Sequence, residues 1–141
     1  MDDLDRFLSA QAPVYVDVLR ELRQGDKTTH WMWFIFPQIA GLGHSETSIR
    51  YAIAGLAQAR RYLEHPVLGA RLRECTGIVA TTKARTAVEI FGSIDATKLR
   101  SSMTLFHRAA PGEALFVEVI DRFFDGVFDP ATDRVLREAP A

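Results

Sequence analysis

The stretch His30-Trp31-Met32-Trp33-Phe34-Ile35-Phe36-Pro37-Gln38 contains both tryptophans of this chain and has a polar side chain at each end of an apolar run. A segment that is apolar on every side cannot lie on a protein surface, so neighbouring elements should enclose it. Pro37 prevents ordinary continuation of a helix and biases the residue before it towards an extended conformation. The stretch is therefore expected to form the centre of the core, the wall of a pocket, or both.

The sequence on both sides of this stretch has helical periodicity. Apolar residues recur at three- and four-residue spacing, for example through 14–22 and 116–124, with polar residues between them. No segment shows the sustained period-two alternation that is typical of strands. We predict an all-α fold, an irregular compact bundle of about seven or eight helices, in a single domain that spans 1–141.

Local signals predict where several helices begin and end. Thr86 begins a capping box, and Gly92 lies where that helix would end. Asp95 can cap the next helix. Asp129-Pro130 combines an N-cap with a proline at the first helical position, so a last short helix is expected near the C-terminus. His65, which precedes a proline, is expected to be a local cap or a turn residue.

Composition restricts the environment and the partners of the protein. The formal net charge of -1 provides no general field for nucleic acid or anionic lipid, so neither is expected as a partner. A single cysteine excludes an intramolecular disulfide and fits a reducing compartment. The acidic start of the sequence is unlike a secretory signal, and no apolar run approaches the ~20 residues of a membrane helix. We expect a cytoplasmic monomer or weak homodimer. A local basic patch remains an alternative, formed by Arg60, Arg61, Arg71 and Arg73.

Four residues of the opening stretch are candidate ligand-binding residues: His30, Trp31, Trp33 and Gln38. Ligand pockets are mostly apolar and contain a few convergent polar groups, which matches this composition. A flat indole beside an imidazole and an amide suits a nucleobase or another planar ligand. In the alternative, the whole stretch is plain core and binds nothing.

The motif Lys98-Leu99-Arg100-Ser101-Ser102-Met103 is a second candidate, because its two cations and two hydroxyls suit a phosphate or a carboxylate. On a continuous helix, Lys98 lies with Ser101 and Ser102, whereas Arg100 lies on another face, nearer His107. If the helix begins only after Arg100, all four groups converge at its N-terminal amides. The alternative is a solvated helix face on which the serines act as caps.

The sequence offers no pattern for metal binding or covalent catalysis. Its histidines lie on separate elements and it has one cysteine, so no metal site is predicted. Cys75 lies on an apolar helical stripe, where a buried and unreactive thiol is expected. Gly41-Leu42-Gly43 lacks the third glycine of a dinucleotide fingerprint. The residues therefore leave the cofactor unknown and leave open whether the protein is an enzyme.

Several motifs together resemble one known family. They are the opening stretch with Gly41-Leu42-Gly43, Tyr51-Ala52-Ile53, Tyr62-Leu63 with His65-Pro66-Val67-Leu68-Gly69, Ile90-Phe91-Gly92, and Lys98 to Phe106. Over roughly residues 2–128 the chain resembles the bacterial family known as domain of unknown function 1810, some of whose members are labelled calpastatin. The resemblance implies an all-helical fold and no particular activity. Calpastatin segments resemble disordered tethers, whereas this sequence has a full set of core-forming stripes, so that label does not fit.

Two functions remain open. The first is binding of a small anionic or nucleotide-like ligand, with or without catalysis, in a pocket that joins the aromatic stretch to the second motif. It predicts an exposed indole edge close to one of the cations of that motif. The second is a non-enzymatic interaction module in which the aromatic stretch is plain core. Its self-association face would include Phe123, Phe124, Val127 and Phe128.

Overall fold

The computed structural model describes residues 4–84 and 86–138, and within them the chain forms nine α-helices and no strand. The helices are α1 (Asp5–Gln11), α2 (Tyr15–Gln24), α3 (Met32–Ile35), α4 (Glu46–Arg50), α5 (Leu56–Glu64), α6 (Leu68–Thr81), α7 (Ala87–Ala109), α8 (Ala114–Phe123) and α9 (Pro130–Glu138). The predicted all-α class is confirmed, and the predicted number of helices is close to the observed one. None of these helices is long and apolar enough to cross a bilayer.

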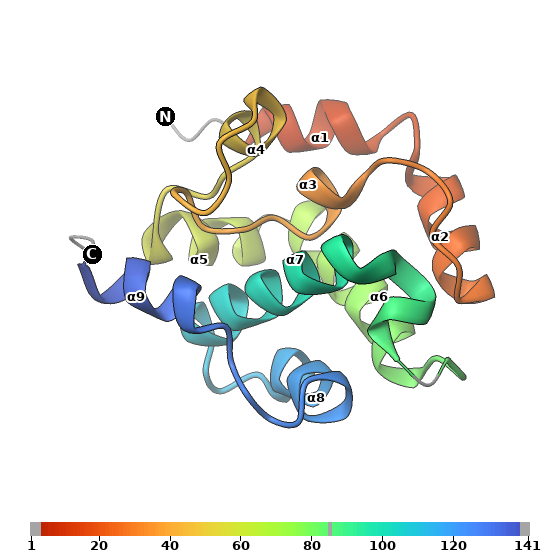
Figure 1. The fold of residues 1–141 in the computed structure, drawn as a ribbon. Coiled ribbons are helices and arrows are strands. Elements are labelled where there is room, and N and C mark those ends of the chain that lie inside the picture. The colour runs from red at the N-terminus through yellow and green to blue at the C-terminus, as the bar shows by residue number, and fades with distance from the viewer. Residues whose placement is uncertain (1–3, 85, 139–141) are drawn as a thin grey trace.

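Helix α7 runs through the middle of the fold (Figure 1). Helices α5, α8 and α9 pack against it, and α6 packs against α5, α8 and α2. Helix α3 contacts α1 and α6. Because α7 has neighbours on several sides, every residue from Ser101 to Phe106 is buried. The second half of α7 is thus part of the core rather than a solvated helix face.

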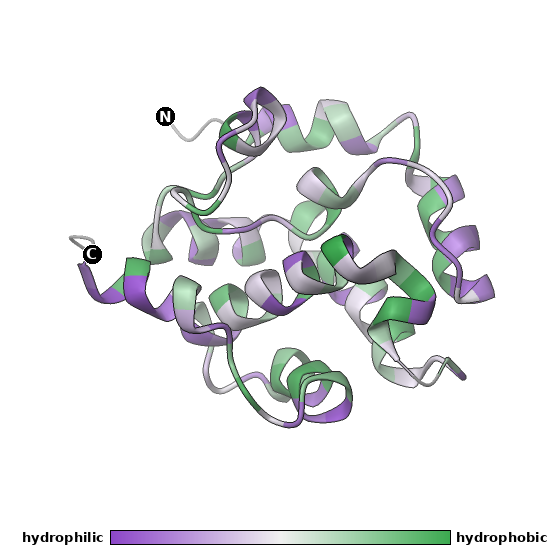
Figure 2. Ribbon diagram, viewed as in Figure 1, coloured by the Kyte–Doolittle hydropathy of each residue, from purple (hydrophilic) through white to green (hydrophobic). Residues whose placement is uncertain are grey.

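The peripheral helices bury only one stripe each. Figure 2 shows α2 and α9 with mainly hydrophilic residues, whereas α8 is largely hydrophobic. In α2 the buried apolar residues are Val18 and Leu22, one turn apart. Helix α8 buries Phe116, Val119 and Ile120. This spacing is the three- and four-residue pattern that predicted the two helices.

The opening stretch divides between core and surface. Trp31, Met32, Ile35 and Phe36 are at most 2% exposed, whereas Trp33 is only partly buried. Helix α3 ends at Ile35, because Phe36 leaves the helical conformation (φ -122°, ψ 74°) directly before the proline. The same stretch therefore supplies core side chains and one indole that reaches towards the outside.

Helix α7 bends at Gly92, where the sequence predicts the end of one helix and the start of another. Gly92 has φ 78° and ψ 166°, a conformation that glycine adopts without strain. The predicted cap at the start of the helix is present, since the Glu89 backbone N–H donates to Thr86 Oγ1 at 3.1 Å. The helix continues beyond the bend without a side-chain cap from Asp95, whose carboxylate pairs with Lys27 and Lys98.

The segment between α3 and α5 folds back on itself. Ile53 N–H donates to Gln38 O and Ala40 N–H donates to Ile53 O, both at 2.8 Å, which forms a parallel bridge between Ile39 and Ile53. The Arg6 guanidinium donates to the carbonyls of Arg50 and Ala52 and so ties the end of this segment to α1. The bridge and the arginine position segment 38–52, which includes α4, across from α7.

Candidate functional site

A hollow of about 710 Å³ lies between α7 and segment 38–52. Trp33 closes one side of it, and Asp129 and Ala131 at the start of α9 contribute to another. Most of the wall is apolar. The volume and composition are those of a small-molecule site, which in proteins spans roughly 300–1,000 Å³.

The hollow brings together four of the eight predicted site residues. They are Trp33 and Gln38 from the opening stretch, and Lys98 and Ser101 from the second motif. The two motifs are far apart in the sequence, and they meet where Lys98 of α7 lies over the Trp33 ring of α3. Trp33 supplies the indole close to a cation that the ligand-binding hypothesis requires.

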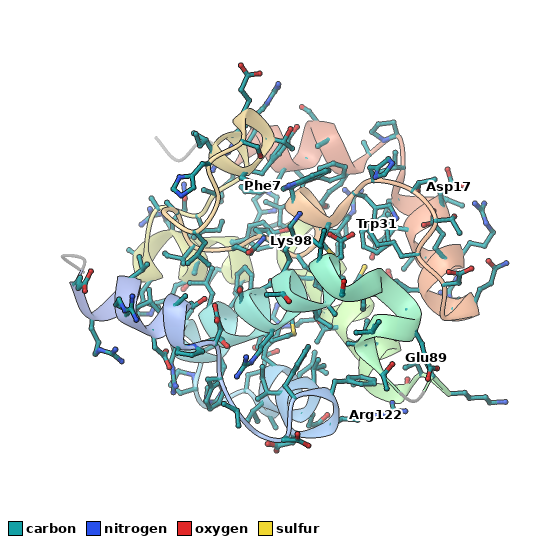
Figure 3. The ribbon with its side chains drawn as sticks, viewed as in Figure 1. Phe7, Asp17, Trp31, Glu89, Lys98 and Arg122 are labelled. Carbon is teal, nitrogen blue, oxygen red and sulfur yellow. The ribbon has the colours of Figure 1, made fainter. Side chains whose placement is uncertain are left out.

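Lys98 extends from α7 towards α3 (Figure 3). Its ammonium lies 4.8 Å from the centroid of the Trp33 ring, a distance at which the ring attracts a cation. The same ammonium lies 3.5 Å from Asp95 Oδ1. The other oxygen of Asp95 lies 2.9 Å from the nearly buried Lys27 ammonium. Two lysines share one carboxylate, so the group carries a net positive charge beside the indole.

Gln38 and Ser101 present polar atoms to the hollow. The backbone carbonyl of Gln38 is held by Ile53, whereas its side-chain amide has no protein partner among the described residues. Ser101 Oγ lies 2.8 Å from Asp129 Oδ2, to which it donates. Asp129 Oδ2 also accepts from Thr132 N and Thr132 Oγ1, at 3.2 and 2.5 Å, so Asp129 is the N-cap that the sequence predicts.

Trp31 lies in the core, away from the hollow. Its indole N–H donates to Glu21 Oε1 at 3.1 Å, and both residues are 1% exposed. Burial alone would raise the pKa of Glu21. Hydrogen bonds from Thr29, Thr28 and Trp31 outweigh this effect and lower that pKa to about 2. Glu21 is therefore ionised at neutral pH and satisfies a polar group inside the fold.

The remaining three predicted residues also lie outside the hollow. Arg100 points to another face of α7, as expected for a continuous helix, and its guanidinium donates to the carbonyls of Val127 and Phe128 at 2.8 and 3.1 Å. Ser102 is fully buried, and its hydroxyl has no partner among the described residues. His30 is exposed. The eight residues thus form no single cluster.

The family comparison agrees with the motifs. The family model described as protein of unknown function (DUF1810) matches residues 1–136. This chain belongs to that family. A crystal structure of the conserved hypothetical protein Rv1873 from Mycobacterium tuberculosis is 49% identical, with a TM-score of 0.95, and the match covers 97% of this chain and 98% of that one. A search of curated proteins found no match.

In this DUF1810 protein, further residues that line the hollow were not among the predicted site residues, and they include His44, Ile49, Ile94 and Asp129. Ile49 and Ile94 are 65% and 72% exposed, which is unusual for isoleucine and gives the hollow an apolar rim. The sequence predicts Asp129 as a helix N-cap and does not indicate that it lines the hollow. No local pattern indicates that the other three face α7 or segment 38–52, because their meeting depends on long-range packing.

The other candidate surfaces are largely occupied by the protein itself. Arg73 pairs with Glu113 at 2.6 Å, and Arg60 donates to the carbonyl of Ala109 at 3.3 Å. In the predicted self-association face, Phe123, Phe124 and Phe128 pack against the core and Val127 is 52% exposed. Among the described residues no group of three His, Cys, Asp or Glu side chains is arranged to hold a metal ion.

Proposed function

We propose that the hollow between α7 and segment 38–52 binds a small ligand that combines an acidic group with a flat or apolar part. The acidic group, a carboxylate or phosphate as in a nucleotide-like compound, would pair with Lys98. The observation that carries this proposal is the Lys98 ammonium 4.8 Å from the Trp33 ring, with both groups in the lining of one hollow.

The surroundings of these two residues support a ligand rather than a purely structural contact. Among the described residues, the one ion pair of Lys98 is 3.5 Å long, to the Asp95 carboxylate, which pairs more closely with Lys27 at 2.9 Å. An ammonium group that is incompletely neutralised and lies beside an apolar wall attracts an anion more strongly than a fully solvated lysine does. The free amide of Gln38 can donate to or accept from the same ligand.

Thermal unfolding and tryptophan fluorescence with benzoate, phenyl phosphate and adenosine monophosphate test the proposal. At 100 times its dissociation constant a ligand adds about 2.7 kcal/mol of apparent stability. Lys98→Met keeps the length of the side chain and removes its charge, and we expect it to weaken binding at least about tenfold. Lys83→Met is the matched control, because this exposed lysine lies outside the hollow.

Two results would contradict the proposal. One is the absence of any stabilisation or fluorescence change across the three compounds at millimolar concentration. The other is equal binding by the Lys98→Met variant and by the wild-type protein, which would place the ligand elsewhere.

We further propose that the protein acts in the cytoplasm as a monomer or weak homodimer and binds no nucleic acid. The formal net charge of -1 and the engagement of Arg60 and Arg73 within the fold support the absence of nucleic-acid binding. The single cysteine fits a reducing compartment. Sedimentation velocity at several protein concentrations tests the oligomeric state. Salt-dependent binding to an oligonucleotide would contradict the proposal that the protein binds no nucleic acid.

A further inference from the structure

The charged residues that line the hollow indicate which class of ligand it can bind. This inference rests on the proposed function. Among its described lining residues, Lys98 and Asp129 carry formal charge at neutral pH. Anion sites that hold two or more phosphates gather several cations, and here the single positive side chain is accompanied by a negative one. The lining therefore suits one acidic group together with one basic group.

The protein holds the Asp129 carboxylate in place through one of its two oxygens and leaves the other available. Oδ2 accepts hydrogen bonds from Ser101 Oγ, Thr132 N and Thr132 Oγ1. Oδ1 has no partner among the described residues. An ionised carboxylate has about four acceptor positions, so this oxygen can accept from a ligand while the other keeps the side chain in place.

In the described part of the chain, Lys98 and Asp129 form no ion pair with each other, so a ligand can bridge them. Lys98 and Ser101 are three residues apart and therefore share one face of α7, ~4.5 Å apart along the helix axis. The Lys98 ammonium lies 3.5 Å from Asp95, and the Asp129 carboxylate lies 2.8 Å from Ser101. In an α-amino acid, the ammonium nitrogen and the carboxylate carbon are ~2.5 Å apart, because one Cα joins them. A hydrogen bond of ~3 Å at each end lets such a molecule link two groups that neighbouring turns of one helix face hold.

We propose that the ligand of this hollow is an α-amino acid with an aromatic or large apolar side chain. Its carboxylate pairs with Lys98, and its ammonium donates to Asp129 Oδ1. Its side chain lies against the apolar wall between Trp33 and the exposed Ile49 and Ile94. A volume of about 710 Å³ leaves most of the hollow to that side chain, which disfavours glycine and alanine.

Isothermal titration with a matched series tests this inference. The probes are L-phenylalanine, 3-phenylpropionate, which lacks the amine, 2-phenylethylamine, which lacks the carboxylate, and adenosine triphosphate. We expect phenylalanine to bind at least about tenfold more tightly than each of the other three, since it alone satisfies both charges.

Two variants assign the charges to the two ends of the ligand. Asp129→Asn keeps an acceptor for Ser101 and Thr132 and a strong N-cap, but its amide N–H₂ repels an ammonium. It should weaken phenylalanine and leave 3-phenylpropionate unchanged. Lys98→Met should weaken both compounds and leave 2-phenylethylamine unchanged. Lys83→Met should bind all four probes as the wild type does.

The outcomes distinguish this inference from the proposed function. If 3-phenylpropionate or adenosine triphosphate binds as tightly as phenylalanine, the amino-acid class is wrong and an anion site remains. The same conclusion follows if Asp129→Asn binds phenylalanine as the wild type does. If none of these probes binds and the three acidic compounds of the first screen also fail, both proposals are overturned.

Discussion

The indole N–H of Trp31 donates a hydrogen bond to Glu21 Oε1 inside the fold, at 3.1 Å, where each residue is 1% exposed. The same oxygen accepts from the backbone N–H groups of Thr28 and Thr29, at 2.7 and 2.9 Å. A buried carboxylate with several donors is stabilised in its ionised form. This contact joins α2 to the start of α3, and it fixes one tryptophan in the core while the other lines the hollow.

Replacing Glu21 should make the fold less sensitive to acid. The pKa of Glu21 is about 2 in the fold and 4.5 ordinarily, so its ionised form contributes stability above pH 4.5 that is lost as the pH falls towards 2. This contribution is about 3 kcal/mol. We expect wild type to exceed Glu21→Gln in free energy of unfolding at pH 7, and the difference to shrink towards pH 2.5 in urea titrations. Asp17→Asn is the matched control, because Asp17 is exposed on the same helix, and a constant difference for Glu21→Gln would contradict the prediction.

Iodide should quench the two tryptophans unequally. Trp31 is 1% exposed, whereas Trp33 lines the hollow beside a lysine that attracts the anion. We expect a curved Stern–Volmer plot for the wild type, and a nearly unquenched signal from Trp31 in the Trp33→Phe variant. Equal quenching of the wild type and of the variant would show that Trp33 is not accessible.

Two glycines of α6 should respond oppositely to alanine. A Cβ on Gly69 would lie 2.1 Å from the Leu63 carbonyl oxygen, so Gly69→Ala should lower the free energy of unfolding by about 2–3 kcal/mol. A Cβ on Gly77 would meet no atom within 4 Å, so Gly77→Ala should raise that free energy by about 0.5–1 kcal/mol. Chemical denaturation measures both changes, and a change of the same sign in the two variants would contradict the packing of α5 on α6.

Removing the imidazole of His65 should weaken the start of α6. Its Nδ1 accepts from the backbone N–H groups of Val67 and Leu68, at 3.1 and 3.2 Å, and so acts as a cap. We expect His65→Ala to lose about 1 kcal/mol of unfolding free energy and His65→Asn to lose less. Thermal unfolding of both variants measures the effect, and equal losses would indicate that the ring acts through packing instead.

Local chemistry made much of the helical framework predictable. Pro37 set the end of α3, Asp129 capped α9, and helical spacing separated Arg100 from Lys98. The burial of Ser102 could not be predicted from helical spacing, because it results from the helices that enclose that part of α7 on several sides. The contact between Lys98 and Trp33 could not be predicted from the sequence either. It depends on how α3 and α7 are placed relative to each other in the fold, and no local period encodes that arrangement.

The bridge between Ile39 and Ile53, together with the hydrogen bonds from Arg6 to the carbonyls of Arg50 and Ala52, anchors both ends of segment 41–49 to the framework. The length and composition of this segment can therefore change without displacing α3 or α5, since loop closure costs little extra for a longer loop. The opposite wall, on α7, is tied to the core and has no such freedom. Exchanging segment 41–49 among homologous proteins is thus a direct route to chimeras with altered selectivity on an unchanged scaffold.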